Sequence, residues 1–355
     1  MPELDATTQT PKTPKVELHV HLDGAIRHST VWELGKKKGL NLPGKDEKEF
    51  EKHINSLQMG DLPAFLKTFE HFLPAVIGDL DAIERIAYEF CHDKVADGIV
   101  YFEARFCPHL MANKVERLFF GQKPGDVTPE MVVQRVCDGI ARGYREYGIK
   151  GRLILCTMRG VPEWCMEILQ LCQKFKGPVV AMDIAGNETL PLDPEHIEAF
   201  QEAERLGIPR VAHAGEAGPA ENVKIAMEVL KAQRIGHGYH IVEDESIYKM
   251  VKDTNIHLEL CPISSLYTGA CSTDWSKHPA IRFAQDGLNI GLNTDDPTVF
   301  CNILDDDFKV AKEKLHFTDE QIIQSVFNSA RACFLPPDEK EELIKQLEEA
   351  YNKKN

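Results

Sequence analysis

The sequence predicts an α/β fold, a (β/α)₈ TIM barrel with additional helices, on three observations. Eight short apolar or β-branched runs recur along the 355 residues, amphipathic stretches separate them, and neither GxGxxG nor GxxxxGK[ST] occurs. Strands that alternate with helices need right-handed crossovers and form a parallel sheet, and eight such units at this length close into a barrel. The competing arrangement, an open doubly wound sheet, leads us to expect a Gly-rich phosphate motif after the first strand.

The eight runs are the predicted strands. They cover residues 16–22, 98–106, 152–157, 178–184, 210–213, 234–237, 256–261 and 288–293. The clearest predicted helices cover residues 79–96, 128–147, 194–206 and 219–231. In the first of these helices Ile83, Ile86, Ala87 and Phe90 share one stripe, which is the face expected to pack on the barrel.

Two segments are longer than a barrel unit requires. The stretch 25–97 predicts a helical insertion after the first strand, and its apolar residues 62–66 are expected to lie over the barrel mouth. Residues 337–354 predict a C-terminal amphipathic helix with Leu343, Leu347 and Tyr351 facing inward. Residues 1–14 are rich in Thr and Pro and predict a flexible tail, which leaves 15–355 as a single domain.

Composition excludes several classes of function. The formal net charge is −15, so nucleic acid is an unlikely partner. No apolar stretch of 18 residues occurs, and the polar N-terminus lacks the features of a signal peptide, so we expect no membrane insertion and a cytoplasmic location. The ten cysteines form no CxxC motif, so we interpret most of them as ordinary small apolar residues of a protein in a reducing compartment.

Polar residues collect where the predicted strands end, the face on which barrel enzymes keep their active sites. The first strand ends in HVHLDGA, in which His19 and His21 share a face, the fifth in HAGE, the sixth in GHGYH and the eighth in NTDDP. Taken alone, the histidine of such a motif is more often a hydrogen-bonded core residue, and the aspartate more often caps a helix. Together, three histidines and a carboxylate suit Zn²⁺ with one position left open for water.

The motifs HVHLDGA, MDIAGNE, HAGE, GHGYH, CPISS and LNTDDP, in this order, resemble the adenosine deaminase branch of the metal-dependent amidohydrolases. The similarity runs from about Lys15 to the C-terminal helix. It implies a (β/α)₈ fold, one zinc ion per chain and hydrolytic deamination of adenosine and 2′-deoxyadenosine, a step of purine salvage and catabolism. Ile263 inside CPISS departs from the family beside, and not on, the functional positions.

The resemblance also implies roles for individual residues. The zinc ligands of the family fall on His19, His21, His213 and Asp295. Glu216 matches the acid that protonates purine nitrogen 1, His237 the histidine that orients the attacking water, and Asp296 the carboxylate that binds purine nitrogen 7.

The substrate pocket follows in the same way. Gly186 matches the glycine whose amide meets purine nitrogen 3, and Asp23 the acid that holds the ribose 5′-hydroxyl. The remaining expected substrate-binding residues are His21, Asp296 and the apolar lid formed by Leu62, Phe65 and Leu66. Two further strand residues, Asp183 and Glu259, are placed to support the ligands or His237 from behind.

Three alternatives stay open. A deaminase of adenine or a related purine fits the same motifs, because only the lid and Asp23 indicate a ribose. A two-metal hydrolase on the same barrel usually needs a carboxylated lysine on the fourth strand, and PVVAMDIAG contains none. A non-enzymatic nucleoside-binding module, or an additional cell-surface protein partner, is compatible with the sequence but cannot be derived from it.

Overall fold

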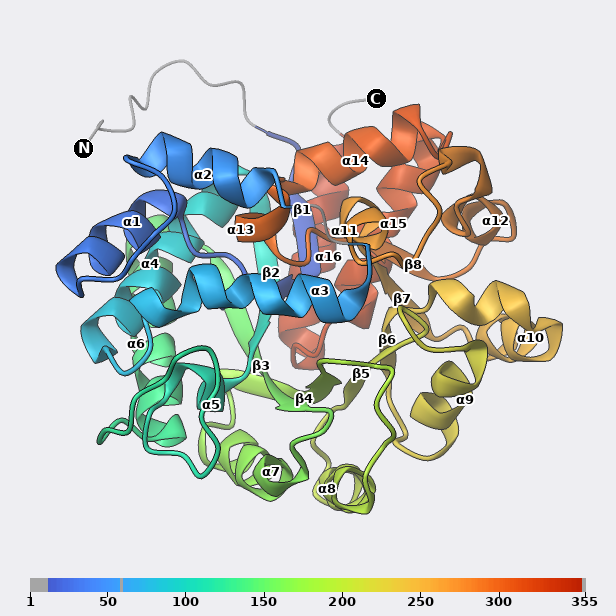
Figure 1. Ribbon diagram of the computed structural model, residues 1–355. Helices are drawn as coiled ribbons and strands as arrows, with labels where there is room; N and C mark the ends of the chain where they lie inside the picture. Colours follow the sequence, from blue (N-terminus) through green and yellow to red (C-terminus); the bar gives the residue numbers. More distant parts are fainter. Residues whose placement is uncertain (1–11, 58–59, 353–355) are drawn as a thin grey trace.

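Eight parallel strands form the centre of the molecule in the computed structural model, which describes residues 12–57 and 60–352 (Figure 1). They are β1 (Lys15–His21), β2 (Ile99–Phe106), β3 (Lys150–Met158), β4 (Val179–Ala185), β5 (Val211–Ala214), β6 (Arg234–His237), β7 (His257–Leu260) and β8 (Ile290–Leu292). Each lies within two residues of a predicted run. The predicted parallel barrel is therefore confirmed.

The ring of strands closes at two seams. The order β1-β2-β3-β4 is continuous, as is β5-β6-β7-β8. A parallel bridge between Met182 and Arg210 joins the first set to the second, and a bridge between Val20 and Asp295 joins the last strand to the first. At this second seam the His21 amide donates to the Asp295 carbonyl at 2.8 Å. The closure places the ends of β1 and β8 side by side.

Helices surround the strands on the outside of the ring (Figure 1). The longer ones are α4 (Leu80–Ala96), α6 (Pro129–Tyr147), α7 (Cys165–Lys174), α8 (Pro194–Arg205), α9 (Ala220–Glu228), α10 (Glu245–Thr254), α14 (Leu304–Glu313), α15 (Asp319–Ala332) and α16 (Pro337–Asn352). Shorter helices follow β2, β7 and β8, namely α5 (Pro108–Met111), α11 (Pro262–Tyr267), α12 (Ala280–Gln285) and α13 (Pro297–Phe300).

The helices begin where the sequence offers caps. Asp79 accepts a hydrogen bond from the Ala82 amide at 3.0 Å at the start of α4, and Thr128 caps α6 in the same way. The apolar stripe of α4 is buried as expected. Helix α9 ends at Glu228, three residues before the predicted end, and the chain then turns with Lys231 in the left-handed region at φ +52°.

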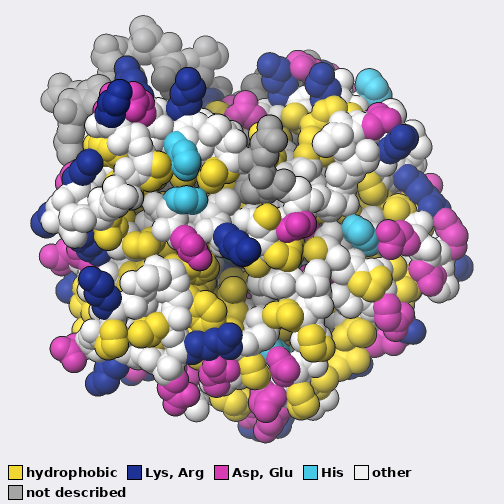
Figure 2. Space-filling view, viewed as in Figure 1, with side chains coloured by type: hydrophobic (Ala, Val, Ile, Leu, Met, Phe, Trp, Pro, Cys, Tyr) yellow, Lys and Arg dark blue, Asp and Glu magenta, His cyan; other side chains and the backbone are white. Residues whose placement is uncertain are grey.

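The segment between β1 and β2 contains α1 (His28–Lys37), α2 (Glu47–Asn55), α3 (Leu62–Lys67), two short 3₁₀ helices (Thr68–His71 and Leu73–Ala75) and α4. Helix α3 crosses in front of the central strands (Figure 1). Asp61 caps it by accepting from the Ala64 amide at 2.7 Å. Hydrophobic side chains gather in the middle of this face, below α3 (Figure 2).

Helix α16 shares a hydrophobic cluster with β1. In α16, Leu343 and Leu347 are buried as predicted, and the Tyr351 hydroxyl donates to the Pro14 carbonyl at 3.1 Å. Most of the predicted tail, residues 1–11, lies outside the described residues. Among the residues described, no helix combines the length and the hydropathy needed to cross a bilayer.

Candidate metal and substrate site

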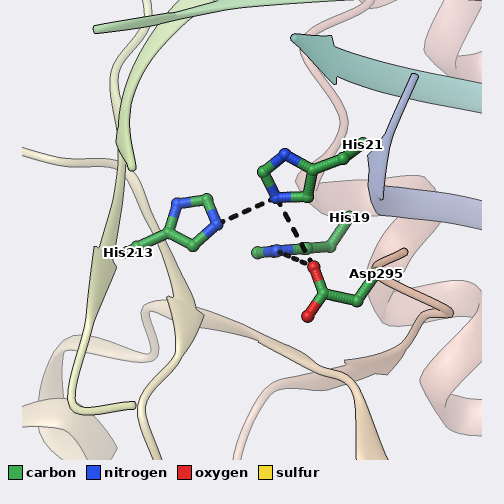
Figure 3. A group of neighbouring side chains, drawn as sticks. All are labelled: His19, His21, His213 and Asp295. Carbon is green, nitrogen blue, oxygen red and sulfur yellow. Dashed lines mark hydrogen bonds and ion pairs between the residues drawn. The ribbon is translucent and has the colours of Figure 1, made fainter. Parts of the chain in front are cut away.

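Four side chains from the ends of three strands converge near the seam between β1 and β8 (Figure 3). His19 and His21 come from β1, His213 from β5 and Asp295 from the loop after β8. Asp295 Oδ1 lies 3.2 Å from His19 Nε2 and 3.4 Å from His21 Nε2, and the Nε2 atoms of His21 and His213 are 3.2 Å apart. One ligand atom from each residue lies within 4.8 Å of the other three. The structure therefore brings together all four predicted metal ligands.

A carboxylate lies behind each of two histidines and indicates which ring nitrogen carries a proton. His19 Nδ1 lies 2.8 Å from Glu259 Oε2, and His213 Nδ1 lies 3.0 Å from Asp183 Oδ2. Because a carboxylate only accepts, each Nδ1 carries a proton, and each Nε2 faces the other side chains of the cluster. In its neutral form each imidazole would offer a lone pair at Nε2, and a cation among the four side chains would accept it together with the Asp295 carboxylate. The donor set therefore fits a divalent metal ion.

Two buried arginines hold the supporting carboxylates. Arg105 on β2 donates to Asp183 at 2.8 Å and to Glu259 at 2.6 Å, and Arg234 on β6 lies 2.7 Å from the other oxygen of Glu259. Burial alone would raise the pKa of Asp183, but His213 and Arg105 hold it below its usual range. Both carboxylates therefore stay ionised as acceptors behind the histidines. The sequence analysis missed the two arginines, although a charged residue inside an otherwise apolar strand was a visible signal.

A pocket beside the four ligands contains the remaining predicted residues. Its lining from the predicted set is His21, Asp23, Leu62, Phe65, Leu66, Gly186, His213, Glu216, His237, Asp295 and Asp296. Phe69, Phe120, Cys107, Cys156, Met158 and Ala185 complete the wall and were not predicted. Leu62, Phe65 and Leu66 of α3 line the pocket, and Phe65 stacks on Phe300 of α13 with ring centroids 5.2 Å apart.

Glu216 and His237 face each other in this pocket. Glu216 Oε2 lies 3.6 Å from His237 Nε2, and both side chains are buried. Burial, with the negative charges of Asp295 and Glu188, raises the pKa of Glu216 well above its usual value. Burial, with the neighbouring His19, lowers the pKa of His237. Both shifts favour the uncharged forms, a protonated Glu216 carboxyl group and a neutral His237 imidazole.

Two further acids present buried oxygens without protein partners. Burial raises the pKa of Asp23 to about 7, and burial with the charges of Asp295 and Asp23 raises that of Asp296 well above its usual value. One oxygen of each carboxyl group has no hydrogen-bond partner among the described residues. Such groups are available to a polar ligand, because leaving them unpaired costs free energy.

Gly186 directly follows β4 in a conformation that a side chain would strain. Its φ is +89°, and a Cβ atom at this position would lie 3.0 Å from Met158 Cε. Gly24 is similarly constrained, because a Cβ there would overlap the Asp296 carboxyl group. Both glycines let the backbone pass close to the pocket wall.

Comparison with known proteins gives a consistent family. A family model described as adenosine deaminase matches residues 14–350. The adenosine deaminase of Danio rerio is 49% identical over 342 residues, covering 95% of each chain, and that of Gallus gallus is 48% identical over 340 residues, also covering 95% of each. An adenine deaminase from Arthrobacter aurescens superimposes with a TM-score of 0.85 at 24% identity, covering 96% of this chain and 100% of that one. A zinc-bound amidohydrolase from Burkholderia ambifaria gives a TM-score of 0.83 at 22% identity, covering 98% and 96%.

Proposed function

The chain belongs to the adenosine deaminase family, and on that premise we propose that it hydrolyses adenosine and 2′-deoxyadenosine to inosine and 2′-deoxyinosine plus ammonia. The observation that carries the proposal is the buried cluster of three imidazoles and one carboxylate beside a pocket that Glu216 and His237 line together. We assign the reaction to one domain, residues 15–355, as the sequence predicts.

The proposed metal is one zinc ion per chain, held by His19, His21, His213 and Asp295. Three imidazole nitrogens and one carboxylate oxygen are zinc donors, and a position left open is typical of catalytic sites. A zinc ion held by these four residues would lower the pKa of a bound water to about 7 and so make hydroxide available at neutral pH. Glu259 and Asp183, which contact the Nδ1 atoms of His19 and His213, would leave each Nε2 available to this ion.

The proposed role of Glu216 is to deliver a proton to purine nitrogen 1. Carbon 6 resists attack because addition breaks the aromaticity of the ring, and protonation of nitrogen 1 makes this carbon more electrophilic. The raised pKa of Glu216 supports the role, since it favours the protonated form that can donate. Addition of the water oxygen to carbon 6 and departure of ammonia then give inosine.

His237 and Asp296 are proposed to position the attacking water and the base. The Nδ1 atom of His237 is buried without a protein partner, and its lowered pKa keeps the ring neutral. A neutral ring can accept a hydrogen bond from the attacking water and then its proton. The raised pKa of Asp296 supports a protonated carboxyl group that donates to purine nitrogen 7.

The sugar and the far edge of the purine define the proposed substrate class. We assign the ribose 5′-hydroxyl to Asp23 and purine nitrogen 3 to the Gly186 amide, with His21 near the reacting edge. Leu62, Phe65 and Leu66 would exclude water above the nucleoside. No Lys or Arg lies among the described pocket residues, which favours a nucleoside over a nucleotide.

The proposal is tested with purified, zinc-loaded protein. We expect adenosine to lose its ultraviolet absorbance with release of one ammonia per inosine, and adenine and adenosine monophosphate to turn over far more slowly. Absence of adenosine turnover would end the proposal. Faster turnover of adenine would replace the nucleoside with the free base as substrate.

We also infer a cytoplasmic location. All ten cysteines are free thiols in the described structure, which fits a reducing compartment. Cell fractionation of the native host with an antibody to this chain would test it, and recovery in a membrane or secreted fraction would contradict it.

A further inference from the structure

Glu188 lies in the loop between β4 and α8 and binds a different loop, the one that carries Glu216. Its Oε1 accepts from the Gly215 amide at 2.6 Å, and its Oε2 accepts from the amides of Glu216, Ala217 and Gly218 at 2.9, 2.8 and 2.9 Å. The side chain is buried, with 3% of its surface exposed. One carboxylate thus satisfies four consecutive backbone donors.

The sequence of residues 215–218 is suited to this arrangement. Gly215 has a φ of +71°, which bends the chain so that the amides point into one concavity. A Cβ atom at Gly218 would lie only 2.8 Å from Glu188 Oε1, so glycine permits the close approach. Asn222, in the first turn of α9, adds a fifth donor at 3.0 Å. Without the carboxylate these buried amides would lack partners, at a cost of about 1–3 kcal/mol for each group left unpaired.

The contact acts on Glu216 and not on the substrate. Among the described residues, the pocket lining includes Glu216 but not Glu188. The four donors are the amide of Glu216 itself and those of the residues on either side of it, so the carboxylate fixes the backbone from which the Glu216 side chain extends. Charge assistance makes such hydrogen bonds roughly twice as strong as neutral ones.

We propose that Glu188 is a positioning residue that holds the 215–218 loop so that the Glu216 carboxyl group meets the purine edge. The inference rests on the proposed function of Glu216. It predicts that weakening the contact lowers kcat while leaving the KM for adenosine and the bound metal nearly unchanged.

The test compares Glu188→Gln with Glu195→Gln in the zinc-loaded enzyme. Glu195 is exposed in the first turn of α8, so its variant makes the same chemical change without the loop contact. The side-chain amide of glutamine carries an NH₂ group, which cannot accept hydrogen bonds from the backbone amides of residues 215–218. We therefore expect kcat to fall on the order of 10²-fold in Glu188→Gln, as for a misplaced catalytic group. The KM for adenosine should change less than about threefold.

A double-mutant cycle separates positioning from a general loss of structure. If Glu188 acts through Glu216, Glu188→Gln should lower kcat by less than about threefold in a Glu216→Gln background. An equally large loss in both backgrounds would overturn the inference. A kcat for Glu188→Gln equal to that of Glu195→Gln would also overturn the inference. The proposed function would still stand in that case if Glu216→Gln has lost its activity.

The shorter Glu188→Asp keeps the charge and provides the measurement if Glu188→Gln does not fold. Retracting the carboxylate by one methylene should also lower kcat with KM retained, and the same cycle with Glu216→Gln applies. A folded Glu188→Asp with the kcat of the Glu195→Gln control would overturn the inference. An active Glu216→Gln would instead overturn the proposed function.

Discussion

The Ser264 hydroxyl donates a 2.6 Å hydrogen bond to Asp295 Oδ2, the carboxylate oxygen opposite the one that faces His19 and His21. Ser264 lies in α11, directly after β7, and is fully buried. The bond orients the Asp295 carboxylate so that Oδ1 points at the ligand cluster. Ser264, which lies behind the ligand cluster, therefore helps to set the orientation of Asp295 within it.

Ser264→Ala should weaken metal binding by about 10-fold, because partners behind a metal ligand contribute about 10–100-fold to affinity. The measurement is metal retention against a competing chelator. Ser265→Ala is the matched control, since it removes a neighbouring buried hydroxyl that bonds to Pro262 and His278 and not to Asp295. Equal metal affinity in the two variants would contradict the prediction.

Asp295→Ala and Glu216→Gln should separate metal binding from proton donation. We expect Asp295→Ala to lose the metal, because a carboxylate ligand is removed. Glu216→Gln should retain the metal and lose about 10²–10⁴-fold in kcat, since an amide cannot donate an acidic proton. Metal analysis and steady-state kinetics on the same preparations measure both effects. Full activity in Glu216→Gln would refute the proton-donor assignment.

Arg105→Met should destabilise the barrel by about 3–5 kcal/mol, because the substitution leaves Asp183 and Glu259 as buried charges short of a partner. Arg234 still contacts Glu259, whereas Asp183 loses its only arginine ion pair among the described residues. Denaturant unfolding gives the free energy. Arg145→Met on the exposed face of α6 is the control and should change stability by less than about 0.5 kcal/mol.

Two buried histidines away from the ligand cluster should make the free energy of unfolding decrease as the pH is lowered. Burial lowers the pKa of His257 to about 4 and that of His278 to about 4, whereas an unfolded histidine titrates near 6.5. The unfolded state therefore takes up protons first as pH falls below about 6.5. Each histidine should lower the free energy of unfolding by about 2 kcal/mol at pH 5 relative to pH 8. Below about pH 4 both states are protonated, and the loss from these groups is complete.

The pH dependence is checked by denaturant unfolding of His257→Gln between pH 8 and pH 4.5. The variant should be less stable at pH 8, since its hydrogen bond to Asn289 is altered, but its stability should fall less steeply in acid. A His257→Gln curve as steep as the parent would show that His257 is not the titrating group.

The sequence predicted the strands well and the pairing of side chains across the barrel poorly. Strand periodicity and the strand-end position of His19 and His21 depend on neighbours in the chain, so they could be recognised directly. The partners of Arg105 lie 78 and 154 residues away, and only the closed ring brings them together. Ser264 lay inside the recognised CPISS motif, but its contact with Asp295 depends on where α11 begins after β7.

The ligand cluster lies at the seam between β1 and β8, where few backbone hydrogen bonds join the two strands. The strands meet there through a single bridge pair, and the Asn293 side chain accepts from the Leu18 and His19 amides in place of a longer backbone ladder. An ion bound to His19, His21 and Asp295 would cross-link the opening and closing strands of the ring. Chelation should therefore accelerate hydrogen exchange of the β1 amides more than that of the β3 amides, which are paired on both sides.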